Sequence, residues 1–151
     1  MQYISTRGEA PELGFADVTL AGLARDGGLY MPRTWPRLEP EAIAALAGRP
    51  FHEVAVEVIA PFTSGDISRV DLSAMARDAY AQFGHAAVTP LVQIGPDLWV
   101  LELFHGPTLA FKDVAMQLLA RMMDHVLARR GQRATIVGAT SGDTGGAAIE
   151  A

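Results

Sequence analysis

The second half of the sequence carries the pattern that most restricts the fold. Its β-like and helical segments alternate, and the turn-forming tripeptide Gly95-Pro96-Asp97 separates the first two of them. In chain order the segments are β-like at 88–94 and 98–104, helical at 109–130, β-like at 134–137 and helical at 144–151. Strands that alternate with helices are typical of a parallel sheet with helical crossovers. We therefore predict an α/β fold with a parallel layer in this half.

The first half of the sequence is predicted to be mainly helical. Apolar residues recur at helical spacing in four segments, and Asp26-Gly27-Gly28 provides a stop after the first. The predicted helices are 15–24, 40–47, 51–60 and 72–83, and short extended segments are expected at 2–5 and 29–32. We therefore predict two parts, a mainly helical N-terminal extension at 1–87 and the beginning of an α/β domain at 88–151.

The last predicted helix indicates that the α/β domain is incomplete. It reaches Ala151 with neither a capping glycine nor a closing strand. A parallel sheet needs further strands and covering helices to bury both of its faces. We therefore expect the domain to be truncated here and to continue beyond Ala151.

Composition excludes several classes of protein. Hydrophobic residues make up 50% of the chain and charged residues 19%, so a packed core is expected rather than disorder. The net charge of -5, without a basic stripe, argues against a nucleic-acid partner. There is no cysteine, no signal-peptide pattern and no run of about 20 apolar residues. We predict a soluble, cytoplasmic protein with no membrane partner.

The single feature that suggests covalent chemistry is Lys112 in the predicted helix 109–130. On a helical projection, Leu119 and Met123 lie within about 20° of it, and Gln117 and Arg121 lie about 140° and 180° away. This pattern places Lys112 at the centre of the apolar face, in the first turn. The side chain could extend past the helix end to water. Alternatively, burial could favour its neutral amine, which attacks aldehydes as a Schiff-base lysine does. Periodicity leaves both interpretations open.

A glycine-rich turn at 138–146 joins the predicted strand to the last helix. Its small residues and the helix N-terminus favour close approach of an anion. Ser141, Asp143 and Thr144 are also good N-cap residues, so an ordinary strand-to-helix turn explains the composition equally well. The turn has neither the Gly-Lys-Ser/Thr ending of a P-loop nor the spacing of a dinucleotide fingerprint.

The residues around Lys112 form a long and specific motif. They read Leu101-Glu102-Leu103-Phe104-His105-Gly106-Pro107-Thr108-Leu109-Ala110-Phe111-Lys112-Asp113. This motif resembles the cofactor-lysine motif of threonine synthases, which are fold-type II pyridoxal-phosphate enzymes. Residues 3–8 and 26–32 resemble the opening of the threonine synthases that carry a helical N-terminal extension. The resemblance extends over residues 3–151, and members of the family are expected to continue for several hundred residues more.

The resemblance implies a substrate, a cofactor and roles for particular residues. The reaction would be the conversion of O-phospho-L-homoserine and water to L-threonine and phosphate, with pyridoxal 5'-phosphate bound to Lys112. The turn would hold the substrate carboxylate through Ser141, Gly142 and Thr144. Asp143 occupies the position where many relatives carry an asparagine that hydrogen-bonds the ring oxygen of the cofactor. An ionised aspartate would repel that oxygen, so this sequence departs from the pattern at a cofactor-binding position.

Three alternatives remain open at this stage. A related lyase such as threonine dehydratase would share the lysine, but the lead-in His105-Gly106-Pro107-Thr108 and the helical extension argue against it. A non-catalytic domain fragment and an anion-binding α/β module that uses only the glycine-rich turn are the others. The four histidines show no metal-ligand spacing, so no metal is predicted. The chain alone is expected to be inactive, and exposed apolar faces make self-association an expected property.

Overall fold

The computed structural model describes every residue of the chain except Ser64. Its residues group into two compact units, the first made of Met1–Arg49 and Val54–Ser73, the second of Pro50–Glu53 and Ala74–Ala151. The elements, in chain order, are β1 (Tyr3–Ser5), α1 (Phe15–Ala21), β2 (Tyr30–Pro32), α2 (Pro40–Ala44), α3 (Phe51–Thr63), α4 (Arg69–Tyr80), β3 (Leu91–Gly95), β4 (Leu98–Leu101), α5 (Asp113–Arg130) and α6 (Asp143–Glu150). The chain is therefore a mixed α/β protein, as the sequence predicts.

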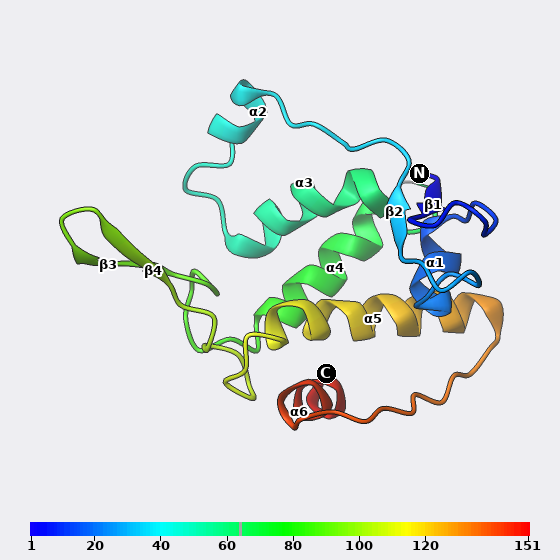
Figure 1. Ribbon diagram of the computed structural model, residues 1–151. Coiled ribbons are helices and arrows are strands. Elements are labelled where there is room, and N and C mark those ends of the chain that lie inside the picture. Colours follow the sequence, from blue (N-terminus) through cyan, green and yellow to red (C-terminus); the bar gives the residue numbers. More distant parts are fainter. Residues whose placement is uncertain (64) are drawn as a thin grey trace. The chain divides into compact units, whose positions relative to one another are not determined.

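The first unit is organised around a short antiparallel ribbon. Strands β1 and β2 pair with Tyr3 opposite Pro32 and Ser5 opposite Tyr30 (Figure 1). The Tyr3 ring is buried, lies 6.2 Å from the Phe15 ring at the start of α1, and its hydroxyl donates to the Phe62 carbonyl at 2.9 Å. A single aromatic side chain thus connects the ribbon to α1 and α3.

A carboxylate begins helix α1 in place of a conventional N-cap side chain. The N-cap is Gly14, and the Ala16 amide donates to Asp66 Oδ2 at 3.0 Å. An added Cβ at Gly14 would lie 3.0 Å from the same oxygen, so glycine gives the carboxylate room. Burial first, and then the negative charge of Asp66, raise the pKa of the Tyr3 phenol. The first N–H groups of a helix have no acceptor within the helix, and Asp66 supplies one for α1 from a distant part of the sequence.

A second carboxylate, that of Asp26, holds the loops at the end of the ribbon. Its Oδ1 accepts hydrogen bonds from the Ser5 hydroxyl and the Gly28 amide, at 2.8 and 2.9 Å. Its Oδ2 accepts from the Glu9 and Ala10 amides, both at 3.0 Å. Desolvation alone would raise the pKa of this carboxyl, but the four donors outweigh it and hold the pKa below the usual 3.8. Only an ionised carboxylate offers acceptors to all four.

Replacing Asp26 by asparagine should destabilise the chain at neutral pH. The amide nitrogen would face two backbone N–H donors, so at least one side of the network would lose its acceptor. Because the folded-state pKa of Asp26 is lowered, its stabilisation is present above the usual value of 3.8 and disappears as the pH falls through the folded-state pKa. Urea midpoints at pH 7 should therefore be lower for the variant, and the difference should shrink towards pH 3.

The control for this prediction is Asp78→Asn, which removes one carboxylate from an exposed position of α4. Its urea midpoint should follow that of the wild type across the same pH range. Equal midpoints for Asp26→Asn and wild type at pH 7 would contradict the role of the Asp26 network.

The second unit is built on helix α5. The hydroxyl of Tyr80, at the end of α4, donates to the Val114 carbonyl in the first turn of α5 at 3.3 Å. The Phe51 ring contacts the Tyr80 ring edge-on, with 4.8 Å between the ring centroids. Burial raises the pKa of the Tyr80 phenol. The core residues of this unit are Ala76, Ala79, Val88, Leu118, Met122, Val126 and Ala147. The helices α5 and α6 contact one another directly.

The strands β3 and β4 form a hairpin that buries neither face. They pair antiparallel, with Leu91 opposite Leu101 and Gln93 opposite Trp99, and the register shifts between Gln93 and Gly95. All the large apolar side chains of the hairpin are exposed: Leu91, Val92, Ile94, Leu98, Trp99, Val100 and Leu101. A two-stranded hairpin is at best marginally stable in water. This one presents a broad apolar surface that the described residues leave uncovered.

The prediction of a parallel layer is wrong for these 151 residues. Every strand pairing among the described residues is antiparallel, in two separate two-stranded sheets. The predicted strand at 134–137 has no regular secondary structure, and Ile136 and Val137 are 73% and 92% exposed. An apolar run becomes a strand only where another strand pairs with it. The described residues contain none that does so.

Most predicted helices and both N-terminal extended segments are confirmed, with shifted ends. Helix α1 is shorter than the predicted 15–24, and α3 continues past the predicted end, through Pro61, to Thr63. Helix α4 begins and ends three residues before the predicted 72–83. The largest change is at α5, which begins at Asp113 rather than at Leu109.

Candidate functional site

Lys112 lies at the junction between an irregular turn and helix α5. It is the N-cap residue, with φ -64° and ψ -23°, and its carbonyl accepts from the Met116 amide at 2.8 Å. The side chain is half-buried, and Nζ lies 4.2 Å from the centroid of the Phe111 ring. Within the described residues no carboxylate pairs with this ammonium. The amine is therefore held by a cation–π contact and not by an ion pair.

The predicted position of Lys112 at the centre of a buried helical face is wrong. Leu118, Met122 and Val126 are buried on α5, at about 240°, 280° and 320° from Lys112 on a helical projection. Gln117, expected on the solvent side, is also buried. Arg121 donates to its Oε1 at 3.0 Å and to its backbone carbonyl at 2.6 Å, whereas its Nε2 has no hydrogen-bond partner among the described residues. Lys112 therefore lies at the edge of the buried stripe.

The turn before Lys112 is closed by the residue after it. Asp113 is fully buried, and its carboxylate accepts from the Thr108 amide at 2.8 Å and from the Thr108 hydroxyl at 2.7 Å. Leu109, inside the turn, has φ +62°, which is unusual for a residue with a side chain. Neither Thr108 nor Asp113 is among the site residues predicted from the sequence. Both could have been predicted from the sequence, because a Thr and an Asp that flank a helix start are typical capping residues.

The glycine-rich turn leads into helix α6. Its N-cap is Gly142, with φ +122°, a conformation that side chains rarely adopt. Ser141, Gly142 and Asp143 are exposed and Thr144 is half-buried. The hydroxyl of Thr140 accepts from the Gly142 and Gly145 amides, both at 3.1 Å. The capping side chain is therefore Thr140, which the sequence analysis did not identify.

The two predicted parts of the site belong to the same compact unit. Helix α6 contacts α5 and lies beside its N-terminal half in Figure 1, the half that follows Lys112. The first N–H groups of any helix lack partners within it, so the start of α6 retains donors for an anion. One unit thus contains the Lys112 amine and the glycine-rich turn at the starts of two contacting helices.

A small cluster of side chains lies just before the Lys112 turn. His105 Nε2 is 2.7 Å from Glu102 Oε2, and the His105 ring centroid is 5.1 Å from that of His85 and 4.7 Å from that of Phe104. The His105 carbonyl accepts from the Gly84 amide at 2.9 Å. No grouping of three or more acidic or histidine side chains suited to a metal ion occurs among the residues described. The cluster packs the turn against the loop that follows α4.

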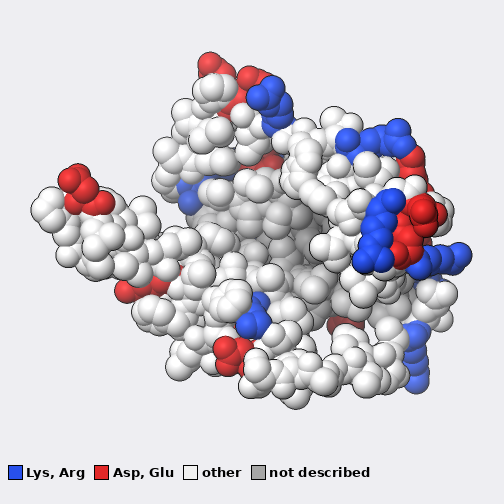
Figure 2. Space-filling view, viewed as in Figure 1, with Lys and Arg blue, Asp and Glu red and all other residues white. Residues whose placement is uncertain are grey.

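Positive and negative side chains are mixed on the face seen in Figure 2. Blue and red atoms lie close to one another there, and most of this face is uncharged. Arg33 and Glu12 of the first unit form an ion pair. Of the helices in the described part of the chain, none has the length and hydropathy required to cross a membrane.

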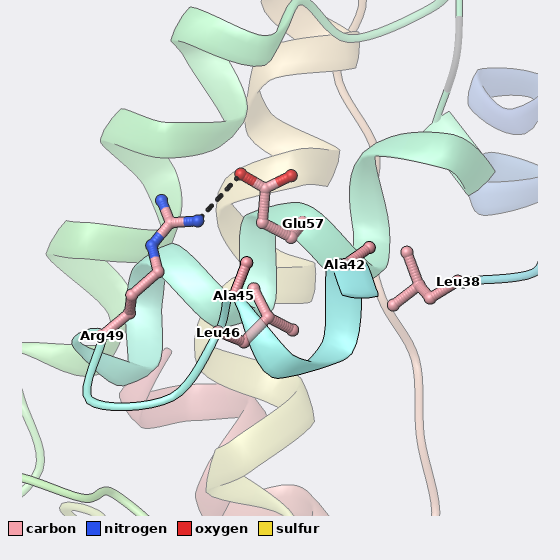
Figure 3. A pocket seen from close by; sticks show the side chains of 6 residues that line it. All are labelled: Leu38, Ala42, Ala45, Leu46, Arg49 and Glu57. Atoms are coloured by element: carbon pink, nitrogen blue, oxygen red, sulfur yellow. Dashed lines mark hydrogen bonds and ion pairs between the residues drawn. The ribbon is translucent and has the colours of Figure 1, made fainter. Parts of the chain in front are cut away.

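The first unit contains a shallow hollow of about 200 Å³ between α2 and α3. Its apolar wall is formed by Leu38, Ala42, Ala45 and Leu46, and Arg49 and Glu57 approach each other across its edge (Figure 3). Hydrogen bonding from Arg69 first, and also from Arg49, holds the pKa of the Glu57 carboxyl below its usual value. Both charged groups at the edge are engaged with each other, so the hollow is an imperfection in packing and not a candidate site.

Comparison with known proteins identifies the lineage. A sequence model described as "Threonine synthase N terminus" matches residues 2–80, which is more than half of the chain. The chain belongs to the threonine synthase family. The threonine synthase of Pseudomonas aeruginosa is 59% identical over 150 residues, and this alignment covers 99% of the chain and 32% of that protein.

Solved threonine synthases have the same fold over these residues. The pyridoxal-phosphate-bound threonine synthase from Brucella melitensis superposes with a TM-score of 0.96 at 67% identity, covering 99% of this chain and 32% of that one. The yeast threonine synthase gives a TM-score of 0.89 at 38% identity, with the same coverage of 99% and 32%. The chain therefore spans about a third of the length of the family members that it matches.

Proposed function

We propose that this chain is the N-terminal third of a cytoplasmic, fold-type II pyridoxal-phosphate enzyme that converts O-phospho-L-homoserine and water to L-threonine and phosphate. The observation that carries the proposal is the lysine motif 101–113, within a fold that superposes on a cofactor-bound threonine synthase. In this proposal residues 1–87 are the helical extension and residues 88–151 begin the cofactor-binding domain. The rest of that domain, including the groups for the cofactor phosphate and pyridine nitrogen, would follow Ala151.

Lys112 fits the role of cofactor lysine on its own geometry. An ion pair with a carboxylate would hold the amine as a cation, and among the described residues Lys112 contacts the Phe111 ring and no carboxylate. It is also the only lysine of the chain. In the proposed enzyme Lys112 would bind the cofactor covalently.

The cofactor would supply an electron sink that stabilises negative charge on the substrate carbons. With the substrate held at the cofactor, the Lys112 amine would take protons from the α and β carbons and return protons to the γ and α carbons. Phosphate would leave from the γ carbon, and water would add at the β carbon. These steps account for every atom of phosphohomoserine and water in threonine and phosphate.

The glycine-rich turn would orient the substrate. Ser141, Gly142 and Thr144 would hold its α-carboxylate at the start of α6, where orphan amides and the helix dipole favour an anion. The Thr140 hydroxyl, which bonds two amides of the turn, would fix its shape before the substrate arrives. Asp143 is exposed at the first position of α6, and we propose that it lies near the ring oxygen of the cofactor.

The test uses the full-length enzyme, meaning this chain together with the sequence that follows codon 151 in its gene. With pyridoxal phosphate and O-phospho-L-homoserine, it should release phosphate and form threonine in equal amounts. Both products should depend on the cofactor. An enzyme that leaves phosphohomoserine unchanged and instead deaminates threonine would be a dehydratase, and the proposal would be wrong.

A further inference from the structure

The carboxylate of Asp113 is the most deeply buried charged group in the unit that contains Lys112. It is fully buried at the first position of α5, and within the described residues no cation pairs with it. Burying an ionised carboxylate is unfavourable unless hydrogen bonds and dipoles compensate. Here both oxygens accept from Thr108, and the N-terminus of α5 favours a negative charge. A carboxylate that served only to stabilise the start of a helix would not need to be so deeply buried.

The turn is shaped around this carboxylate. An added Cβ at Gly106 would lie only 2.4 Å from both Cβ and Oδ2 of Asp113, so a larger residue would displace the acid. Gly106 is itself buried. Its carbonyl accepts from the Leu109 amide at 3.1 Å, and the Asp113 amide donates to the Ala110 carbonyl at 3.1 Å. Two successive turns therefore lead from Gly106 into the helix, with the carboxylate bridging them.

Leu109 shows that the turn is under constraint. Its φ of +62° places a γ-branched residue in the left-handed region, which is unfavourable for a residue with a side chain. The side chain is 70% exposed, so its own packing gives little compensation. The conformation is maintained by the groups on either side, above all by the bonds between Thr108 and Asp113. Strain of this kind, three residues from a reactive amine, is typical of a preorganised site.

We infer that Asp113 is a positioning residue for Lys112, acting through Thr108. The inference rests on the proposed function. The backbone of Lys112 lies between the closed turn and the helix, where its carbonyl already accepts from Met116. Only the side-chain torsions of the lysine then remain free, so the backbone position from which its side chain extends is fixed. Loss of the hydrogen bonds between Thr108 and Asp113 would let the turn relax and shift the backbone of Lys112. The amine would then be misplaced relative to the carbons from which it takes protons.

The test compares two substitutions of Thr108 in the full-length holoenzyme. Thr108→Val removes the hydroxyl bond to Asp113 but keeps the amide bond, and Thr108→Ser keeps both. Thr108→Val should lower kcat about 10- to 100-fold with little change in KM, the range expected for a misplacement of about 1 Å. Thr108→Ser should retain at least half of kcat. Asp113→Asn, which replaces one acceptor oxygen with a donor, should resemble Thr108→Val. Thr34→Val, at an exposed position of the N-terminal extension, is the matched control.

Two further readouts separate positioning from folding and from failure of the proposed function. The absorbance spectrum of the lysine-bound cofactor should shift in Thr108→Val and Asp113→Asn but not in Thr108→Ser. Borohydride should still attach the cofactor to Lys112 in all three variants, since the amine is intact. The inference is overturned if Thr108→Val and Asp113→Asn keep kcat within twofold of wild type, or if they lower only the melting temperature. Absence of any adduct in the wild type would refute the proposed function itself.

Discussion

Replacing Lys112 by alanine should abolish covalent capture of pyridoxal phosphate and lower kcat of the full-length enzyme by about 10³-fold or more. General acid–base catalysis alone contributes about 10²- to 10⁴-fold, and this residue would also hold the cofactor. Within the 151 residues the substitution leaves the α-amino group of Met1 as the only amine that can react. Borohydride reduction followed by peptide mass mapping should find the adduct on the peptide that contains Lys112, and nowhere else in this chain.

Lys112→Arg is the matched variant for this experiment. Arginine keeps the positive charge and can keep the contact with the Phe111 ring, but it does not form the covalent link. It should therefore fold like the wild type and still lack both adduct and turnover. An adduct that persists in Lys112→Ala, or an arginine variant that turns over phosphohomoserine at more than a few per cent of the wild-type rate, would show that another lysine carries the chemistry.

Local chemistry determined which parts of the fold could be predicted from the sequence. The helices 40–47 and 51–60 and the extended segments 2–5 and 29–32 were found because apolar spacing and turn residues act over a few positions. The strand at 134–137 was wrong because pairing is non-local, and Val137 stays 92% exposed without a partner. The sequence also gave no indication that Asp66 would supply an acceptor to the Ala16 amide from fifty residues away.

The site was predicted unevenly for the same physical reason. Lys112 and the turn 138–146 could be named because a continuous motif and a glycine-rich composition mark them. The helical projection failed because it assumed that Gln117 faces solvent, whereas Gln117 is buried and Arg121 donates to its side-chain oxygen. The projection also began α5 four residues too early, because apolar spacing continues through Leu109, whereas the backbone at Leu109 is left-handed. Such conformations depend on tertiary hydrogen bonds that periodicity does not report.

The 151-residue chain by itself should show no threonine synthase activity. It spans about a third of the relatives that it matches, and its hairpin β3–β4 exposes Trp99 and six aliphatic side chains. Residues 134–137 have no regular secondary structure, as expected for a segment whose partners lie elsewhere in the polypeptide. We therefore expect Lys112 and the turn 138–146 to form only part of the pocket. Phosphate release from O-phospho-L-homoserine should equal that of the Lys112→Ala chain, which sets the background.

Adding the separately expressed remainder of the enzyme provides the complementary measurement. If the exposed hairpin and the segment 134–137 are surfaces made for that remainder, mixing should restore cofactor-dependent phosphate release. Alone, the chain should elute from size exclusion with an apparent mass that rises with concentration, because its uncovered apolar surface can meet that of a second copy. Turnover above background by the purified 151-residue chain would instead mean that these residues hold a complete site. The groups that bind the cofactor phosphate would then have to be sought among the described residues, beginning with the amides at the start of α6.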